Sequence, residues 1–223
     1  FRRVLFRSEL RSNQEVNGFT TNPTLMRNAG VSNYLDFASK VVEAVDPLPI
    51  SLEVFADEDE LIFKQAKLLN SLGKNVFVKL PVTNTNGKSL APLAQKLNEV
   101  GIKLNITAIM TEQQVEDYTK HLDFEVENIF SIFAGRIADT GIDPVGMIKN
   151  AILLTSISSN WSILWASPRE ILNLRQAEEI GCHIITMTPD LWKKISLLGK
   201  NLEQYSLETV KMFHTDAQIA GFE

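Results

Sequence analysis

Short apolar segments rich in β-branched residues recur along the chain and alternate with segments of helical pattern. The apolar segments cover residues 16–21, 50–56, 75–82, 104–109, 128–134, 162–166 and 183–187. We interpret them as seven strands, because each has strand length and is bounded by turn-forming or helical sequence. Strict alternation of strand and helix favours parallel βα units over a meander of hairpins. The sequence therefore predicts an α/β fold.

The segments between the strands carry signals for the start and end of helices. Asp57, followed by Glu60, predicts a capping box for a helix that places Leu61, Leu68 and Leu72 on one face and ends at Gly73. Further starts are predicted at Thr111 with Gln114, at Ser167 with Pro168, Arg169 and Glu170, and at Thr188 with Pro189. Residues 200–223 predict a last helix, which would be available for subunit packing.

Composition limits the classes of protein that the chain can represent. With 223 residues and 44% hydrophobic content, residues 1–223 are expected to form one domain with a sizeable core. The formal charge of −5 is spread along the chain, so no nucleic-acid partner is expected. One cysteine, Cys182, and three scattered histidines predict no disulfide and no metal site. No apolar run suits a membrane span or signal peptide, so a soluble protein is expected, and the single cysteine favours the reducing cytoplasm.

Polar residues at the ends of the predicted strands distinguish two α/β architectures, the doubly wound sheet and the barrel. They recur two residues apart, as in Ser51 with Glu53 and Asn105 with Thr107, so each pair shares one face of its strand. A closed barrel gathers such faces inside its rim and turns the aliphatic faces toward the helices. We therefore predict a (β/α)8 TIM barrel whose first strand is missing or atypical.

Lys79 lies in the middle of an apolar strand, where an unpaired ammonium group is costly. Desolvation favours the neutral amine, which is the form that attacks a ketone to make an iminium. The iminium then withdraws electrons from the neighbouring carbon–carbon bond. The alternative interpretation is that Lys79 reaches solvent from the strand end or pairs with Glu53 for purely structural reasons.

Each of the other candidate residues also has one functional and one structural interpretation. Glu53 could relay protons through a water held by Thr107, or form a structural ion pair. Asn22 and Asn105 could bind the hydroxyls of a polyol, or be satisfied core amides. Two arginines, Arg136 and Arg169, could bind a phosphate together with the helix start at Ser167, or be merely solvated.

Six segments together resemble the transaldolase family, including its short fructose-6-phosphate aldolase-like branch. They are GFTTNPTLM (18–26), SLEVFAD (51–57), VFVKLPVT (76–83), GIKLNITAIMT (101–111), SIFAGRIADTG (131–141) and WASPREI (165–171). Their order and spacing match the family from about residue 9 to residue 190 or beyond. This combination is more specific than any one motif.

The resemblance implies a class I aldolase mechanism without metal or organic cofactor. Lys79 would be the Schiff-base lysine, and Glu53 and Thr107 would hold the catalytic water. The implied substrate contacts are Thr20, Asn22 and Asn105, with Ser131 and Phe133 from the S-x-F-x-G-R segment and Ser167, Arg136 and Arg169 on the phosphate side. Implied substrates are sugar phosphates such as fructose 6-phosphate and erythrose 4-phosphate. A homo-oligomer with exchanged C-terminal helices is also implied.

Two comparisons with the family pattern bear on the activity, one a match to the transaldolase type and the other a departure. The aldolase branch usually has Gln at the position of Glu53 and Tyr at that of Phe133, so transfer of a three-carbon unit is favoured over simple cleavage. The family's first strand also carries an aspartate, whereas no Asp precedes Asp36 here. Residues 1–8 are interpreted as a non-native or atypical start, of which residues 4–6 could form a makeshift strand. A catalytically impaired sugar-phosphate-binding barrel is the second hypothesis.

Overall fold

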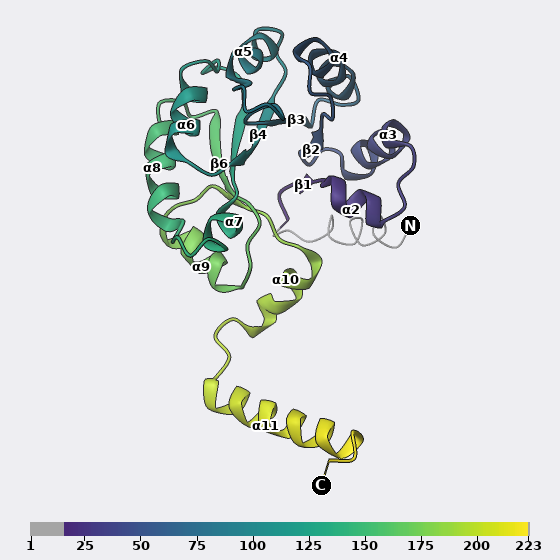
Figure 1. Ribbon diagram of the computed structural model, residues 1–223, viewed down its shortest axis with the longest axis vertical. Helices are drawn as coiled ribbons and strands as arrows, with labels where there is room; N and C mark the ends of the chain where they lie inside the picture. The colour runs from purple at the N-terminus through teal and green to yellow at the C-terminus, as the bar shows by residue number, and fades with distance from the viewer. Residues whose placement is uncertain (1–15, 223) are drawn as a thin grey trace.

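The computed structural model describes residues 16–222, in which seven parallel strands form one curled sheet (Figure 1). The strands follow one another in chain order, each hydrogen-bonded to the next. They are β1 (Phe19–Thr20), β2 (Ile50–Glu53), β3 (Val76–Pro81), β4 (Leu104–Ile109), β5 (Asn128–Ile132), β6 (Trp161–Trp165) and β7 (Ile184–Ile185). All seven predicted strands are confirmed, and most are shorter than their apolar segments.

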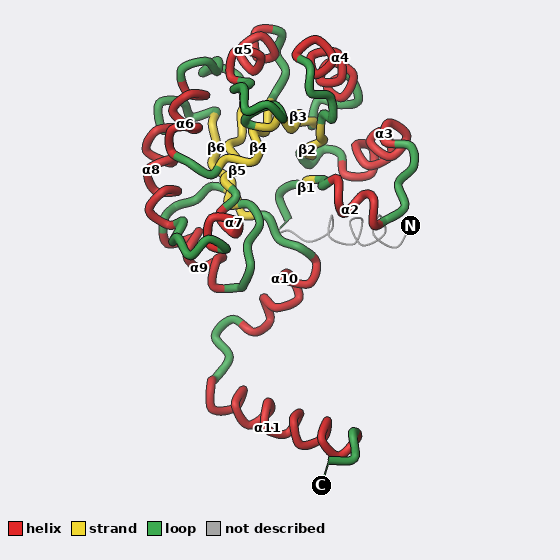
Figure 2. Tube along the Cα trace, in the orientation of Figure 1, coloured by secondary structure: helices red, strands yellow, loops and turns green. Residues whose placement is uncertain are grey.

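Most helices surround the sheet on its outer side, whereas the last one, α11, extends away from it (Figure 2). In chain order, the helices are α2 (Pro23–Asn28), α3 (Tyr34–Val45), α4 (Asp59–Asn70), α5 (Ala91–Glu99), α6 (Glu112–Thr119), α7 (Ala134–Ala138), α8 (Val145–Thr155), α9 (Leu172–Glu179), α10 (Pro189–Lys193), a 3₁₀ turn (Lys194–Leu197) and α11 (Leu202–Ile219). The predicted barrel architecture is thus found for seven strands. Residues 1–8, including the proposed makeshift strand at 4–6, lie outside the described residues.

The two faces of the strands pack in two separate apolar clusters. On β3, Val76, Val78 and Leu80 are fully buried in the large cluster between sheet and helices. Phe77 points the other way and packs in a small cluster with Ile129, Leu164 and Ala166 inside the curled sheet. The aliphatic face of β3 therefore lies toward the helices, as expected for a barrel, and Lys79 shares the inner face with Phe77.

The structure corrects the predicted helix that begins at Asp57. Helix α4 starts at Asp59 with Glu58 as its N-cap, and no capping box forms. The Asp57 carboxylate instead accepts hydrogen bonds from the backbone N and Oγ1 of Thr85 at 2.7 and 2.6 Å, which lower the pKa of Asp57. The helix ends before Gly73, and it buries Ile62, Ala66 and Leu69 rather than the predicted leucines. The leucine at 61 is instead exposed to solvent, as is that at 68.

Of the other predicted helix starts, two are confirmed and one is wrong. Thr111 caps α6 with the predicted capping box, and Thr188 caps α10. Ser167 does not cap a helix, because α9 begins only at Leu172 and Ser167 has a φ of 61°. A left-handed residue is not a helix N-cap, which has an extended backbone. The Ser-Pro-Arg-Glu pattern therefore forms a turn at the end of β6.

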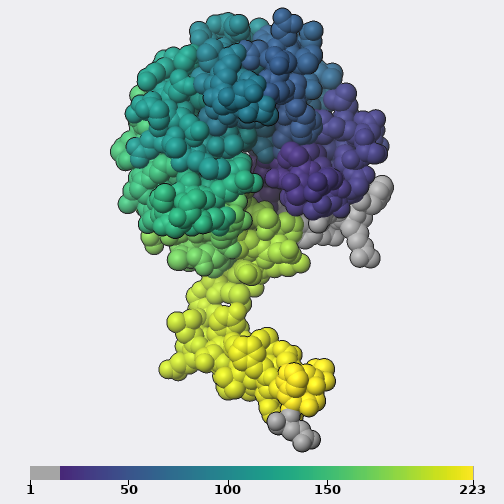
Figure 3. Space-filling model, viewed as in Figure 1, coloured from purple at the N-terminus to yellow at the C-terminus, as the bar shows by residue number. Residues whose placement is uncertain are grey.

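The predicted C-terminal helix is confirmed as α11, which extends away from the barrel (Figure 3). None of its residues is buried within the chain. Between residues 16 and 222, no helix is both long and apolar enough to cross a membrane.

Candidate active site

The centre of the candidate site is an ion pair on the inner face of the sheet. Parallel pairing of β2 with β3 sets Glu53 opposite Lys79. The Lys79 Nζ lies 2.9 Å from the Glu53 Oε1, and the two side chains are 13% and 9% exposed. Burial of an ion pair is a poor way to gain stability, since desolvation offsets the attraction. Lys79 is therefore paired with Glu53, as one interpretation proposed, and the pair lies where barrel enzymes carry their reactive groups.

Thr21, which the sequence analysis did not select, contacts both members of this pair. Its carbonyl oxygen accepts a hydrogen bond of 2.8 Å from the Lys79 Nζ. Its hydroxyl contacts the Glu53 Oε2 and lies 2.9 Å from the Ser51 carbonyl oxygen. The side chain is almost fully buried. The second threonine of the TTNP segment was the available signal, but its contacts across to β2 and β3 depend on the fold.

A second chain of hydrogen bonds crosses the neighbouring strands. The Asn105 Nδ2 donates to the Ser51 Oγ at 2.9 Å, and the Ser131 Oγ donates to the Asn105 Oδ1 at 2.6 Å. Asn105 is buried and sits opposite Lys79 in the register of β3 with β4. The structure thus gathers Lys79, Glu53, Asn105 and Ser131 from four strands into one polar patch. Ser51 is a second member that was not selected as a site residue.

Three other candidates lie at the rim of this patch. Thr107 is half-buried on β4 and pairs in register with Pro81, two residues beyond Lys79. Thr20 is half-buried on β1, next to Ser51 in register. Asn22 is exposed and caps α2, because its Oδ1 accepts a hydrogen bond of 3.1 Å from the Leu25 N. The structure therefore uses the Asn22 oxygen for the helix start.

Two non-glycine residues with positive φ angles lie near the carboxyl ends of strands of the site, Ala108 within β4 and Ser167 after β6. Ala108 has a φ of 63° at an irregularity in the pairing of β4 with β5, directly after Thr107. Ser167 has a φ of 61° after the end of β6. Such conformations are costly for residues with a Cβ and are concentrated at functional sites. Ala108 therefore changes the register of β4 with β5, and Ser167 turns the chain after β6.

The candidates for the phosphate side meet where α7 approaches the turn after β6. A Cβ built on Gly135 would lie 1.7 Å from the Ser167 carbonyl oxygen and 3.1 Å from the Arg169 Nε. The close approach therefore requires a residue without a side chain in the FAGR segment. Arg136 follows in α7 and places its guanidinium over the half-buried Phe133 ring at 5.7 Å.

Arg169 forms an exposed ion pair with Asp139 of the α7 end. Its Nε lies 3.1 Å from the Asp139 Oδ1, and its Nη2 contacts the Oδ2. Both side chains are about half exposed, at 51% and 54%. An exposed pair of this kind contributes on the order of 1 kcal/mol or less, so an anion can displace the carboxylate.

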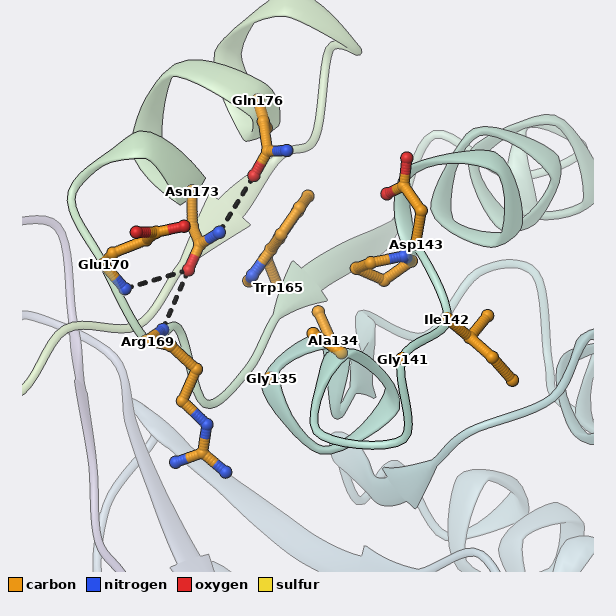
Figure 4. A pocket seen from close by; sticks show the side chains of 12 residues that line it. Ala134, Gly135, Gly141, Ile142, Asp143, Trp165, Arg169, Glu170, Asn173 and Gln176 are labelled. Atoms are coloured by element: carbon orange, nitrogen blue, oxygen red, sulfur yellow. Dashed lines mark hydrogen bonds between the residues drawn. The ribbon is translucent and has the colours of Figure 1, made fainter.

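A cavity of about 290 Å³ lies between α7, the segment that precedes α8, and α9. Among the candidate residues only Arg169 lines it, and the Arg169 guanidinium extends away from Asn173 and Gln176 (Figure 4). The Asn173 Oδ1 accepts from the backbone N atoms of Arg169 and Glu170 at 2.8 and 3.2 Å. This cavity is therefore separate from the Lys79 patch.

Tyr34 completes the surroundings of Glu53. The Tyr34 hydroxyl donates to the Glu53 carbonyl oxygen at 2.8 Å, and its ring contacts Phe55 edge-on at a centroid distance of 4.8 Å. Burial, with a smaller contribution from the Glu53 charge, raises the pKa of Tyr34 above its ordinary value. Tyr34 therefore stays a neutral donor. Over residues 16–222, no group of three or more His, Cys, Asp or Glu side chains could hold a metal ion.

Comparison of the sequence with known proteins identifies the family of the chain. Residues 3–222 match the family described as Transaldolase/Fructose-6-phosphate aldolase. A probable transaldolase 2 of Listeria monocytogenes serovar 1/2a (strain ATCC BAA-679 / EGD-e) is 33% identical over 197 residues, which cover 85% of this chain and 84% of that protein. A probable transaldolase of Thermoanaerobacter sp. (strain X514) is 29% identical over 173 residues, or 77% of this chain and 76% of that protein.

Solved structures support the barrel architecture. A monomeric variant of dihydrodipicolinate synthase superposes with a TM-score of 0.59 at 16% identity, over 97% of this chain and 74% of that chain. A dihydrodipicolinate synthase of Bacillus anthracis superposes with a TM-score of 0.57 at 14% identity, over 95% of this chain and 73% of that chain. At such identities the likeness concerns the fold alone, whereas the sequence matches cover nearly the whole chain. This chain belongs to the transaldolase/fructose-6-phosphate aldolase family.

Proposed function

We propose that the chain is a transaldolase that transfers a three-carbon dihydroxyacetone unit between sugar phosphates through a Schiff base on Lys79. The observation that carries the proposal is the buried Lys79–Glu53 pair, which is bound by Thr21 and lies beside the Asn105–Ser131 chain. A buried amine with a carboxylate 2.9 Å away has the nucleophile and the proton acceptor that imine formation requires. Family membership supports this assignment.

In the proposed cycle, the neutral Lys79 amine attacks the C2 ketone of fructose 6-phosphate and water leaves. The resulting iminium accepts the electron pair of the C3–C4 bond while the C4 hydroxyl loses its proton. A three-carbon aldose phosphate departs, and the enamine attacks the aldehyde of an acceptor such as erythrose 4-phosphate. Glu53, with a water held by Thr107, would exchange the protons.

Substrate contacts are assigned by position around the patch. Asn105 and Ser131 would bind hydroxyls near the reacting carbons, together with Thr20 and the amide group of Asn22. The phosphate would lie toward Ser167, Arg136 and Arg169, beside the Phe133 ring, and would replace Asp139 as the partner of Arg169. No bound cofactor is needed in this scheme. The proposed location is the cytoplasm.

Borohydride reduction tests the Schiff base directly. With fructose 6-phosphate, the reduced adduct is expected on the Lys79 peptide by mass spectrometry and is expected to be missing in Lys79→Met. Lys103→Met is the matched control, because Lys103 is also half-buried and lies 4.6 Å from the Phe77 ring centroid, and it should keep the adduct. A wild-type protein that stays unmodified with several ketose phosphates would refute the proposal.

Product analysis separates transfer from the alternatives. A transaldolase forms a seven-carbon ketose phosphate when erythrose 4-phosphate is present, whereas a fructose-6-phosphate aldolase releases free dihydroxyacetone without an acceptor. Adduct formation without either product would indicate a catalytically impaired sugar-phosphate-binding barrel. Glu53 and Phe133 support transfer, since the aldolase branch usually has Gln and Tyr at these positions.

We also propose that the chain forms a homo-oligomer through α11. Leu207, Val210 and Phe213 recur at helical spacing on this helix and are 47%, 60% and 62% exposed. An apolar stripe of this kind is typical of an interface. Light scattering is expected to give a multiple of 25.0 kDa for the wild type and a lower mass for Phe213→Glu.

The matched control for this prediction is Thr215→Glu, which adds the same charge to another exposed position of the same helix. It should leave the mass unchanged. A wild-type mass of 25.0 kDa would contradict the proposed assembly.

A further inference from the structure

The Thr21 hydroxyl lies within hydrogen-bond distance of two acceptor oxygens but has only one proton to donate. Its oxygen contacts the Glu53 Oε2 and lies 2.9 Å from the Ser51 carbonyl oxygen. A carbonyl oxygen only accepts, and an ionised carboxylate also only accepts. The hydroxyl therefore donates to one of the two at a time. The Ser51 carbonyl does not depend on this bond, because it also accepts from the Thr21 N at 3.1 Å.

Each protonation state of Glu53 fits this arrangement without movement of a heavy atom. When Glu53 is ionised, the Thr21 hydroxyl donates to the Oε2. When Glu53 carries a proton on the Oε2, the carboxylic acid donates to the Thr21 Oγ1, and the hydroxyl turns its own proton toward the Ser51 oxygen. A hydroxyl can exchange its donor and acceptor roles between these two neighbours, since its hydrogen rotates freely about the C–O bond.

We propose that Thr21 is a positioning residue that hydrogen-bonds Glu53 in both of its protonation states, so that Glu53 releases and recovers a proton without rearrangement. This inference rests on the proposed Schiff-base function. In the step that needs it, the carbinolamine on Lys79 takes a proton from the Glu53 carboxylic acid and loses its hydroxyl as water. The products are the iminium and the Glu53 carboxylate, and hydrolysis of the imine reverses the transfer.

Thr21 also restrains the nucleophile. Its carbonyl oxygen accepts from the Lys79 Nζ at 2.8 Å, while the Glu53 Oε1 accepts from the same nitrogen at 2.9 Å. One residue therefore holds the amine by its backbone and the carboxyl group by its side chain. In the described part of the chain, the titratable groups in contact with Glu53 are Lys79 from β3 and Tyr34 from α3. Tyr34 bonds the backbone of Glu53 and not its carboxylate.

The test compares Thr21→Val with Thr21→Ser. Valine has nearly the shape of threonine without the hydroxyl, whereas serine retains it. The rate of borohydride-trapped imine formation with fructose 6-phosphate is expected to fall by about 10- to 100-fold in Thr21→Val, with KM changed by less than about threefold. Thr21→Ser is expected to retain most of the wild-type rate.

A pH profile distinguishes this role from a structural one. Loss of a donor to the carboxylate disfavours the ionised form. The low-pH limb of the rate profile should therefore move to higher pH in Thr21→Val than in the wild type. Thr155→Val is the matched control, because Thr155 is equally buried and its hydroxyl donates only to backbone oxygens in α8. It should leave rate and profile unchanged.

Each result decides the inference. A wild-type rate and profile in Thr21→Val would overturn it, as would a Thr21→Ser protein as slow as the valine variant. If Thr21→Val does not fold, Thr21→Ala replaces it, and loss of folding in both would assign the hydroxyl to the fold and overturn the inference. A wild-type protein without an adduct on Lys79 would instead refute the proposed function itself.

Discussion

Replacing Lys79 with methionine is expected to abolish transfer activity and to lower the free energy of unfolding by about 3 kcal/mol. The loss of activity follows from removal of the amine. The loss of stability has a different cause, because the Glu53 carboxylate would be left buried without its cation. Assays of transfer and chemical denaturation of the same protein measure the two effects.

The double variant Lys79→Met with Glu53→Gln separates these causes. A neutral amide beside methionine removes the uncompensated charge, so most of the lost stability should return while activity stays absent. Glu53→Gln alone should fold and should lower the rate by about 10²- to 10⁴-fold, as expected for loss of a general acid and base. A double variant no more stable than Lys79→Met would show that Glu53 is not the source of the destabilisation.

Replacing Gly135 with alanine is expected to have the second largest effect. The added Cβ would lie 1.7 Å from the Ser167 carbonyl oxygen, which belongs to the backbone and cannot swing aside. Either α7 or the turn after β6 must move, at a cost of about 3 kcal/mol. The same movement displaces Ser167 and Arg169, so the KM for phosphorylated substrates should rise more than that for unphosphorylated analogues. Thermal unfolding and KM comparison check both effects.

Gly146→Ala is the matched control, because nothing lies within 4 Å of a Cβ built there. Gly146 is in helix α8, where alanine is favoured over glycine by about 1 kcal/mol. This variant should be at least as stable as the wild type. If Gly135→Ala had the same stability and KM values as the wild type, the close contact of α7 with the turn after β6 would be refuted.

The strands and their inner and outer faces could be predicted because alternation with a period of two is local in sequence. Lys79, Glu53 and Asn105 were selected for this reason, and parallel register brings them together. Thr21 and Ser51 were missed as site residues because their importance comes from contacts with other strands, which local pattern does not contain.

The errors also have physical causes. Asp57 and Ser167 have the residue types of helix caps, but each is used differently in the fold. Asp57 binds the Thr85 loop, and Ser167 turns the chain with a positive φ. A capping pattern shows only that a helix start is chemically possible, and a competing tertiary contact decides whether it forms. The Asn22 oxygen also caps α2, whereas a contact between its amide group and a sugar hydroxyl stays a prediction.

The separation of the two faces of β3 has a consequence for changing this protein by design. Val76, Val78 and Leu80 attach the strand to the helices, whereas Phe77 and Lys79 face the interior of the curled sheet. Substitutions on the inner face should therefore change the polar patch around Lys79, while the packing of the strand against the helices stays in place. If the proposed function holds, variants of the inner face should alter substrate preference with little change in the free energy of unfolding.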